Sequence, residues 1–89
     1  MLKTTLKISN KLGLHARASA KLTKLAGGFK SEVFLSRNDR RVNAKSIMGV
    51  MMLAAGCGTE VEVEVDGSDE QVALDSIRAL IDGKFGEGQ

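Results

Sequence analysis

One stretch of this chain alternates apolar and acidic side chains with a strict period of two: Thr59-Glu60-Val61-Glu62-Val63-Glu64-Val65-Asp66. Successive side chains of a β-strand point to opposite faces, so the three valines share one face and the three glutamates share the other. A strand of this kind belongs to a sheet with one face on a hydrophobic core and the other in water, which is typical of antiparallel sheets. The stretch therefore predicts an antiparallel sheet built around residues 59–66.

Three further strands are predicted before this one. Residues 2–8 show the same alternation, with Leu2, Thr4, Leu6 and Ile8 facing inward. Residues 31–37 and 41–44 are expected to pair as a hairpin, because Asn38 and Asp39 between them are residue types that favour turns.

Helical patterns separate these strands. Residues 16–26 are rich in Ala, Leu and Lys and place apolar side chains at helical spacing. A short helix is expected over residues 47–55 with Ser46 as its N-cap. A last helix is expected to begin after Ser68, with Gln71 completing a capping box, and to end at Gly83.

The element order is thus β-α-β-β-α-β-α. Strands with one apolar face and amphipathic helices indicate an α+β fold with the helices on one side of an open antiparallel sheet. The chain has 89 residues and neither an internal repeat nor a linker-like tract, so residues 1–89 are expected to form one domain. Residues 84–89 are predicted to be a frayed tail, although Phe85 could fold back onto the core.

The composition excludes several classes of protein. The chain is 43% hydrophobic and 27% charged, which is typical of a globular domain. There is neither a signal-peptide pattern nor an apolar run long enough to span a bilayer, so a cytoplasmic location without membrane insertion is expected. The single cysteine, Cys57, agrees with a reducing compartment, and one His and one Cys predict no metal site.

The one histidine of the chain, His15, lies in the stretch Gly13-Leu14-His15-Ala16-Arg17-Ala18-Ser19, at the expected start of the first helix. Unpaired backbone N–H groups and the positive end of the helix dipole favour an anion there and favour a neutral imidazole. A neutral ring nitrogen is a nucleophile, and a phosphoryl group on it would meet the N–H groups of Ala16 and Arg17 and the Arg17 guanidinium. The hypothesis is a phosphohistidine site. The simpler alternative is an ordinary surface histidine and a solvated arginine.

Two motifs together resemble the HPr family of phosphocarrier proteins, the histidine-phosphorylated components of the bacterial phosphoenolpyruvate-dependent phosphotransferase system. The motifs are Gly13-Leu14-His15-Ala16-Arg17 and, thirty residues later, Lys45-Ser46-Ile47-Met48-Gly49-Val50-Met51. The resemblance implies an open-faced sandwich with a four-stranded antiparallel sheet, the first strand beside the fourth and three helices on one face. Many members have proline after the arginine, whereas this chain has Ala18, which bears on the rigidity of the turn rather than on the chemistry.

The resemblance also implies a mechanism. Enzyme I would transfer a phosphoryl group to Nδ1 of His15, and an A-type enzyme II component would take it from there. The protein would be a substrate of these enzymes, not an enzyme, and would need no cofactor. Reversible transfer requires a weakly held phosphate, so Arg17 is expected to be exposed and free of a fixed salt bridge.

The second motif carries two further predictions. In residues 47–53 nearly every side chain is apolar, and a short helix on a small domain cannot bury all of them. Val50 and Leu53 are expected in the core, while Ile47, Met48 and Met51 would form an exposed surface for docking partners. Ser46 is predicted to cap this helix, and the resemblance implies regulatory phosphorylation there by an HPr kinase/phosphorylase.

Other interpretations remain open. A small basic RNA-binding module fits the net charge of +2, but the chain has only three Phe and neither Trp nor Tyr for base stacking. A small-molecule regulatory domain would need a pocket that the sequence does not reveal. Cys57 between two glycines has no orienting partners for nucleophilic catalysis. The charge is too mild to argue for a nucleic-acid partner by itself, so none is expected, and a monomer is expected.

Overall fold

Four strands form one antiparallel sheet in the computed structural model of this chain, which describes residues 1–87. Their order across the sheet is β1-β4-β2-β3, so the first strand lies beside the fourth, as the resemblance implied. The strands are β1 (Leu2–Lys7), β2 (Glu32–Arg37), β3 (Arg40–Asn43) and β4 (Glu60–Asp66).

Strand β4 lies between β1 and β2, and its two faces explain the regular alternation of valine and glutamate. The side chains of its three valines have no exposed surface, whereas its glutamates lie on the wet face of the sheet. There Lys3 stands opposite Glu64, and its Nζ atom lies 3.8 Å from Glu62 and 3.9 Å from Glu64. The register of β1 against β4 is therefore favoured by charge pairs on the outer face and by burial of apolar side chains on the inner face.

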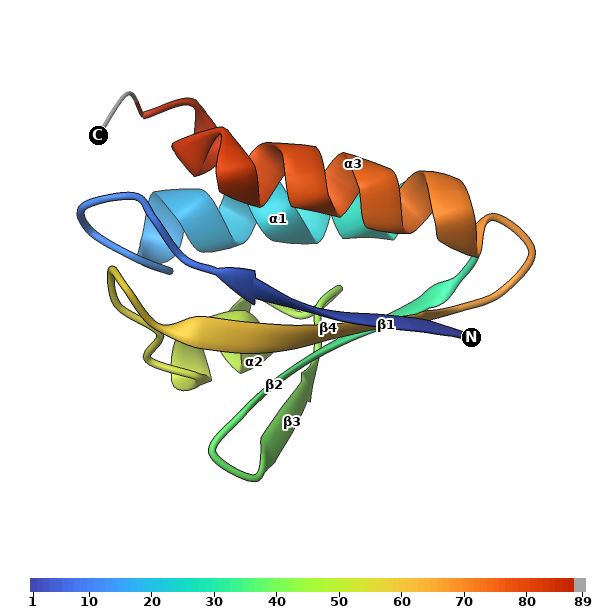
Figure 1. Ribbon diagram of the computed structural model, residues 1–89, viewed down its shortest axis with the longest axis horizontal. Helices are drawn as coiled ribbons and strands as arrows, with labels where there is room; N and C mark the ends of the chain where they lie inside the picture. Colours follow the sequence, from blue (N-terminus) through green and yellow to red (C-terminus); the bar gives the residue numbers. More distant parts are fainter. Residues whose placement is uncertain (88–89) are drawn as a thin grey trace.

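Helices α1 (Ala16–Gly27) and α3 (Glu70–Asp82) run side by side over one face of the sheet (Figure 1). The short helix α2 (Ile47–Met52) contacts α1 and β3, and the 3₁₀ turn η1 (Lys84–Gly86) follows α3. Apolar side chains from the helices and from the inner face of the sheet make one continuous core. The predicted open-faced α+β sandwich is confirmed. None of the described helices is long and apolar enough to cross a membrane.

Helix α2 is shorter than the sequence predicts. It ends at Met52 rather than at residue 55, because Ala54 adopts a left-handed conformation with φ of 52°. Two arginines of the β2–β3 hairpin bind the carbonyl groups at this end: Arg37 donates to Leu53 at 2.9 Å and Arg40 to Met52 at 2.7 Å. These cations satisfy carbonyl groups that the helix itself cannot pair.

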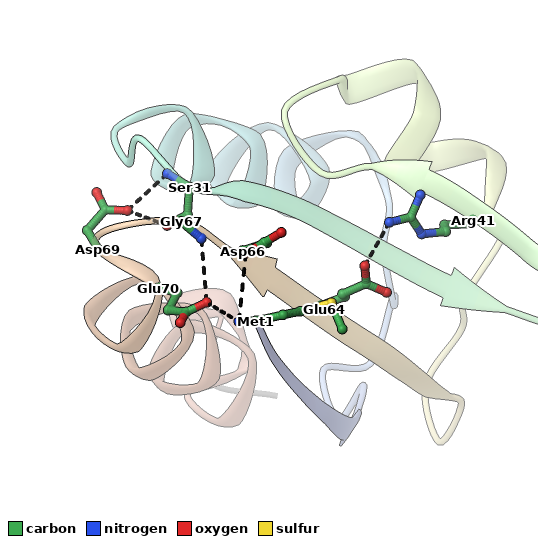
Figure 2. A network of polar contacts seen from close by, with 8 residues as sticks. All are labelled: Met1, Ser31, Arg41, Glu64, Asp66, Gly67, Asp69 and Glu70. Atoms are coloured by element: carbon green, nitrogen blue, oxygen red, sulfur yellow. Dashed lines mark hydrogen bonds and ion pairs between the residues drawn. The ribbon is translucent and has the colours of Figure 1, made fainter.

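The start of α3 also differs from the prediction. Its N-cap is Asp69 rather than Ser68, and the Asp69 carboxylate accepts hydrogen bonds from the Lys30 and Ser31 backbone N–H groups, both at 2.9 Å, instead of capping its own helix. The Ser31 hydroxyl donates to the same carboxylate (Figure 2). The hydrogen bond from this hydroxyl, followed by that from Lys30, lowers the pKa of Asp69 below its ordinary value. The predicted capping box is thus replaced by a link between α3 and the start of β2.

The amino terminus is tied to the same end of the molecule. Its ammonium group lies 2.9 Å from the Glu70 carboxylate and 3.7 Å from that of Asp66 (Figure 2). The hydrogen bond with the ammonium group lowers the pKa of Glu70, and the same contact raises the pKa of the terminal amine. Edge strand β1 is therefore fastened to the first turn of α3.

The carboxyl-terminal segment corrects another prediction. Phe85 has no exposed surface and packs in the core, and the backbone of Gly86 and Glu87 is hydrogen-bonded back to residues 83–84. The expected frayed tail is therefore wrong for residues 84–87, because one aromatic side chain buries enough area to order the segment. Residues 88–89 of the same prediction lie outside the described residues.

Candidate functional site

The loop before α1 is shaped by close contact between two backbones. Gly13 has a φ of 66°, and a Cβ atom there would lie 2.5 Å from the Ala55 carbonyl oxygen and 2.6 Å from the Gly56 Cα atom. Only glycine fits this position, for reasons of both conformation and space. The next residue, Leu14, is buried, and so the chain enters α1 at a defined point.

His15 is the N-cap of α1, as predicted. Its backbone is extended, with φ of −76° and ψ of 179°, and its carbonyl accepts the first helical hydrogen bond from the Ser19 N–H at 2.8 Å. The Ser19 hydroxyl donates to the Leu14 carbonyl at 3.1 Å, which fixes the first turn from inside. The imidazole itself caps no backbone N–H group of the helix.

Arg17 and Ala16 are exposed on the first turn. Within residues 1–87 the Arg17 guanidinium forms neither an ion pair nor a side-chain hydrogen bond. This agrees with the expectation that Arg17 is free of a fixed salt bridge. A hollow of about 550 Å³ opens here, lined by Lys11, Leu12, His15, Ala16, Arg17 and Glu87. The predicted site residues of this loop therefore share one hollow, at the positive end of α1.

Glu87 is a residue of this hollow that sequence reasoning missed and that contacts His15 directly. Its Oε2 atom lies 2.6 Å from Nε2 of His15, and its Oε1 atom accepts a hydrogen bond from Nδ2 of Asn10 at 3.0 Å. The Asn10 hydrogen bond, followed by the contact with His15, lowers the pKa of Glu87 below its ordinary value of 4.5, against the opposing effect of desolvation. A carboxylate therefore faces the imidazole at neutral pH. No periodic pattern relates residues this far apart in sequence.

The predicted docking surface is exposed. Met48 is 67% exposed, and Ile47 and Met51 are each 39% exposed, while Val50 and Leu53 lie in the core as predicted. Two further apolar side chains that sequence reasoning left out are also exposed: Met52 at 57% and Leu12 at 67%. We call the five exposed side chains, Leu12, Ile47, Met48, Met51 and Met52, the apolar surface.

Ser46 caps α2 as predicted. Its hydroxyl oxygen accepts a hydrogen bond from the Gly49 N–H at 3.2 Å, and its own side chain is exposed. The neighbouring Lys45 donates to the Phe29 carbonyl at 2.9 Å, which ties this corner to the end of α1. The hydroxyl is thus both a structural group and accessible from solvent.

Cys57 does not line the hollow beside His15. Cys57 is exposed, and its thiol lies near the Ser9 carbonyl, at 3.8 Å. Among residues 1–87, no three His, Cys, Asp or Glu side chains are grouped so as to hold a metal ion.

These features define a class: a small open-faced sandwich with a histidine at a helix start, an arginine two residues on, and exposed apolar side chains on the short helix α2. The family model for the phosphorylation site of the HPr component of the phosphotransferase system matches residues 2–83. The chain is 65% identical to the phosphocarrier protein HPr of Cupriavidus necator, over the whole of both chains. The chain belongs to the HPr family, and it is a phosphocarrier protein of the bacterial phosphotransferase system, not an enzyme.

Solved structures agree with this assignment. HPr-C-His from Thermoanaerobacter tengcongensis matches with a TM-score of 0.95 at 41% identity, covering 98% of each chain. An HPr dimer from the same organism matches with a TM-score of 0.79 at 41% identity, covering 98% of this chain and 100% of the other. Family members thus occur in dimeric form as well, and the monomer expected here stays a prediction.

The alternative of an RNA-binding module gains no support. Phe85 is buried, and Phe29 and Phe34 are half-buried. The Arg41 guanidinium lies 3.6 Å from the centre of the Phe34 ring, so that ring is already covered. The rings of Phe34 and Phe85 are therefore not open to base stacking, and Phe29 alone would make a poor stacking platform.

Proposed function

We propose that His15 accepts a phosphoryl group from enzyme I and passes it to an A-type enzyme II component. The observation that carries the proposal is the position of the imidazole at the N-cap of α1, 28% exposed and in one hollow with Arg17. A phosphoryl group on this ring would lie at the helix end where backbone N–H groups lack intrahelical partners.

The backbone N–H groups of Ala16 and Arg17 and the Arg17 guanidinium would stabilise the phosphoryl oxygens. Each such contact is worth about 0.3–1 kcal/mol at an exposed site and up to about 2 kcal/mol where it is partly buried. An exposed arginine and a helix end bind the group without enclosing it. The phosphorylated and free proteins therefore stay close in free energy, as a reversible carrier requires.

The apolar surface would dock both partners in turn. Methionine side chains are flexible and polarizable and adapt to different surfaces, and three of the five residues of the apolar surface are methionines. We expect the carrier to act as a monomer in the cytoplasm, because one exposed site must be open to a donor and then to an acceptor.

A direct experiment tests this function. The protein is incubated with enzyme I and phosphoenolpyruvate, and the product is examined for a phosphoryl adduct that is labile in acid and stable in base, as expected of a phosphohistidine. The adduct should form on the wild type and be absent from His15→Ala. Cys57→Ser serves as the control and should be phosphorylated normally. An adduct that persists in His15→Ala contradicts the proposal.

We further propose that phosphorylation of Ser46 by an HPr kinase/phosphorylase weakens docking. A phosphate there adds about two negative charges at the start of α2, among the residues of the apolar surface. ATP and such a kinase should add one phosphate to the wild type and none to Ser46→Ala, as measured by mass spectrometry. The phosphorylated protein should then accept phosphate from enzyme I more slowly. An unchanged rate would remove the regulatory part of the proposal.

A further inference from the structure

The carboxyl-terminal segment places the Glu87 carboxylate against the His15 ring. Its Oε2 atom is 2.6 Å from Nε2, and the Glu87 side chain is only 16% exposed. Phe85 anchors this segment in the core, and the Lys21 ammonium donates to the Phe85 carbonyl at 2.6 Å. The segment that carries the carboxylate is therefore fixed by tertiary contacts with the core and with α1.

Asn10 determines which kind of atom Glu87 presents to it. Nδ2 of Asn10 donates one hydrogen to the Gly13 carbonyl at 2.8 Å and the other to Oε1 of Glu87 at 3.0 Å. Because both partners are acceptors and Asn10 has no exposed surface, its amino group must face them. The atom of residue 87 beside Asn10 must therefore be an acceptor.

The other carboxylate oxygen determines where the imidazole carries its proton. An ionised carboxylate only accepts hydrogen bonds, so the contact at 2.6 Å requires a proton on Nε2 of His15. In the neutral ring the lone pair then lies on Nδ1, since each tautomer has one donor and one acceptor nitrogen. A ring nitrogen with a free lone pair is the nucleophile that phosphoryl acceptance needs.

We propose that Glu87 is a positioning residue for phosphoryl acceptance: it holds the His15 proton on Nε2 and leaves Nδ1 free to attack phosphorus. This inference rests on the proposed function of His15. Glu87 acts through the ring and does not touch the phosphoryl group. Asn10 supports it by holding the carboxylate in the required orientation.

The transfer step balances with this arrangement. The Nδ1 lone pair forms the new N–P bond while the N–P bond of the donor's phosphohistidine breaks, and that electron pair stays on the donor's ring nitrogen. The proton on Nε2 of His15 is retained, so the His15 ring gains a positive charge as the protonated donor ring loses one. The Glu87 carboxylate stabilises this new charge through a charge-assisted hydrogen bond.

Glu87→Gln is the informative variant, because an amide has one acceptor and one donor end. Asn10 requires the acceptor end, so the amide NH₂ of residue 87 would face Nε2 of His15. A donor there pairs with an unprotonated Nε2 and moves the ring proton to Nδ1, which blocks the nucleophile. Glu87→Ala merely opens Nε2 to water and leaves both tautomers accessible. We therefore expect the glutamine variant to be slower than the alanine variant.

The expected rates follow this order. Transfer from enzyme I should fall about fivefold in Glu87→Ala, through loss of one hydrogen bond, and at least about tenfold in Glu87→Gln, through the wrong tautomer. Glu60→Gln, on the outer face of the sheet, loses the same charge and should keep the wild-type rate. Equal rates for both Glu87 variants, or a wild-type rate in Glu87→Gln, would overturn the proposal.

A second measurement needs no partner protein. Nitrogen-15 spectra of the His15 ring at alkaline pH, where the ring is neutral, should show the proton on Nε2 in the wild type and in Glu60→Gln, and a shift toward Nδ1 in Glu87→Gln. The same tautomer in wild type and Glu87→Gln would overturn the positioning role. If instead the spectra change as expected but no variant, wild type included, is phosphorylated, the proposed function fails while the control of the tautomer stands.

Discussion

The backbone N–H of Leu14 donates to the Ala55 carbonyl at 2.9 Å, which fastens the residue before His15 to the segment that follows α2. This contact brings the two sequence motifs into one corner of the molecule. It depends on Gly13, whose lack of a side chain lets the backbones approach.

Gly13→Ala should therefore be strongly destabilising. The new Cβ atom would lie 2.5 Å from the Ala55 carbonyl oxygen at a φ of 66°, so both conformation and space oppose it. We expect a loss of about 2–4 kcal/mol in the free energy of unfolding, measured with urea. Gly27→Ala is the matched control, because nothing lies within 4 Å of its Cβ position inside a helix. It should be neutral or slightly stabilising, and equal losses in both variants would contradict this account.

Arg17→Ala should slow phosphoryl transfer without lowering the stability of the fold. The Arg17 side chain is exposed and makes no ion pair within residues 1–87, so the melting temperature should stay within about 2 °C of the wild type. Phosphoryl transfer from enzyme I should slow at least about tenfold, because a charge-assisted contact with the phosphoryl group is lost. Lys24→Ala removes another exposed cation of α1 and should leave the rate unchanged. A large loss of stability in Arg17→Ala would mean that the residue is structural.

Met48→Asp should weaken docking without unfolding the domain. Met48 is 67% exposed, so its replacement should change the free energy of unfolding by less than about 0.5 kcal/mol. A buried charge in the interface with enzyme I should lower the affinity about tenfold or more, measured by calorimetric titration. Val72→Asp on α3 is the control, since Val72 is 60% exposed but outside the apolar surface. Equal weakening by both substitutions would show that charge alone, not the surface, is responsible.

Ser46 should prove to be a stabilising cap. Ser46→Ala loses the hydrogen bond from Gly49 and should lower the free energy of unfolding by about 0.5–2 kcal/mol. Ser46→Asp keeps a good capping group and should lose less. Ser68→Ala provides the contrast, because Asp69 rather than Ser68 occupies the N-cap of α3, and should change stability by less than about 0.5 kcal/mol. A larger effect at Ser68 than at Ser46 would contradict the observed caps.

The pair formed by the amino terminus and Glu70 should make stability depend on pH at both ends of the range. The pKa of Glu70 is lowered from 4.5, so its contribution is full above 4.5 and is lost as pH falls through the lowered value. The pKa of the terminal amine is raised from 8.0, so its contribution is full below 8.0 and is lost as pH rises through the raised value.

Urea unfolding of the wild type should therefore give a plateau between these limits, with a decline on each side. Glu70→Gln removes the nearer negative partner and should make both declines shallower, while Asp66 and the other carboxylates with lowered pKa values keep part of each. Asp75→Asn, on the exposed side of α3, is the control and should keep the wild-type profile in the alkaline range. A profile for Glu70→Gln that coincides with the wild type would show that the pair contributes nothing.

Much of the fold could be read from local patterns. The alternation of valine and glutamate in β4 determined a sheet with one buried face, because side-chain direction in a strand follows sequence position alone. The excess of apolar residues in the α2 segment required exposed methionines, because a helix of this length cannot bury its whole surface. The histidine at a helix start and the arginine after it likewise follow from local sequence, and so does the cap formed by Ser46.

Only the tertiary structure decided the contacts between distant segments. Asp69 binds the start of β2 rather than its own helix, Ala54 ends α2 early, and burial of Phe85 orders a segment that the sequence suggested was frayed. The same burial brings Glu87 to His15. Such pairings depend on where the whole core places each backbone, and no periodic pattern in the chain encodes that separation. The sequence by itself thus determined the order of the elements and the place of the imidazole at a helix start, and the packed core decided which carboxylate lies against it.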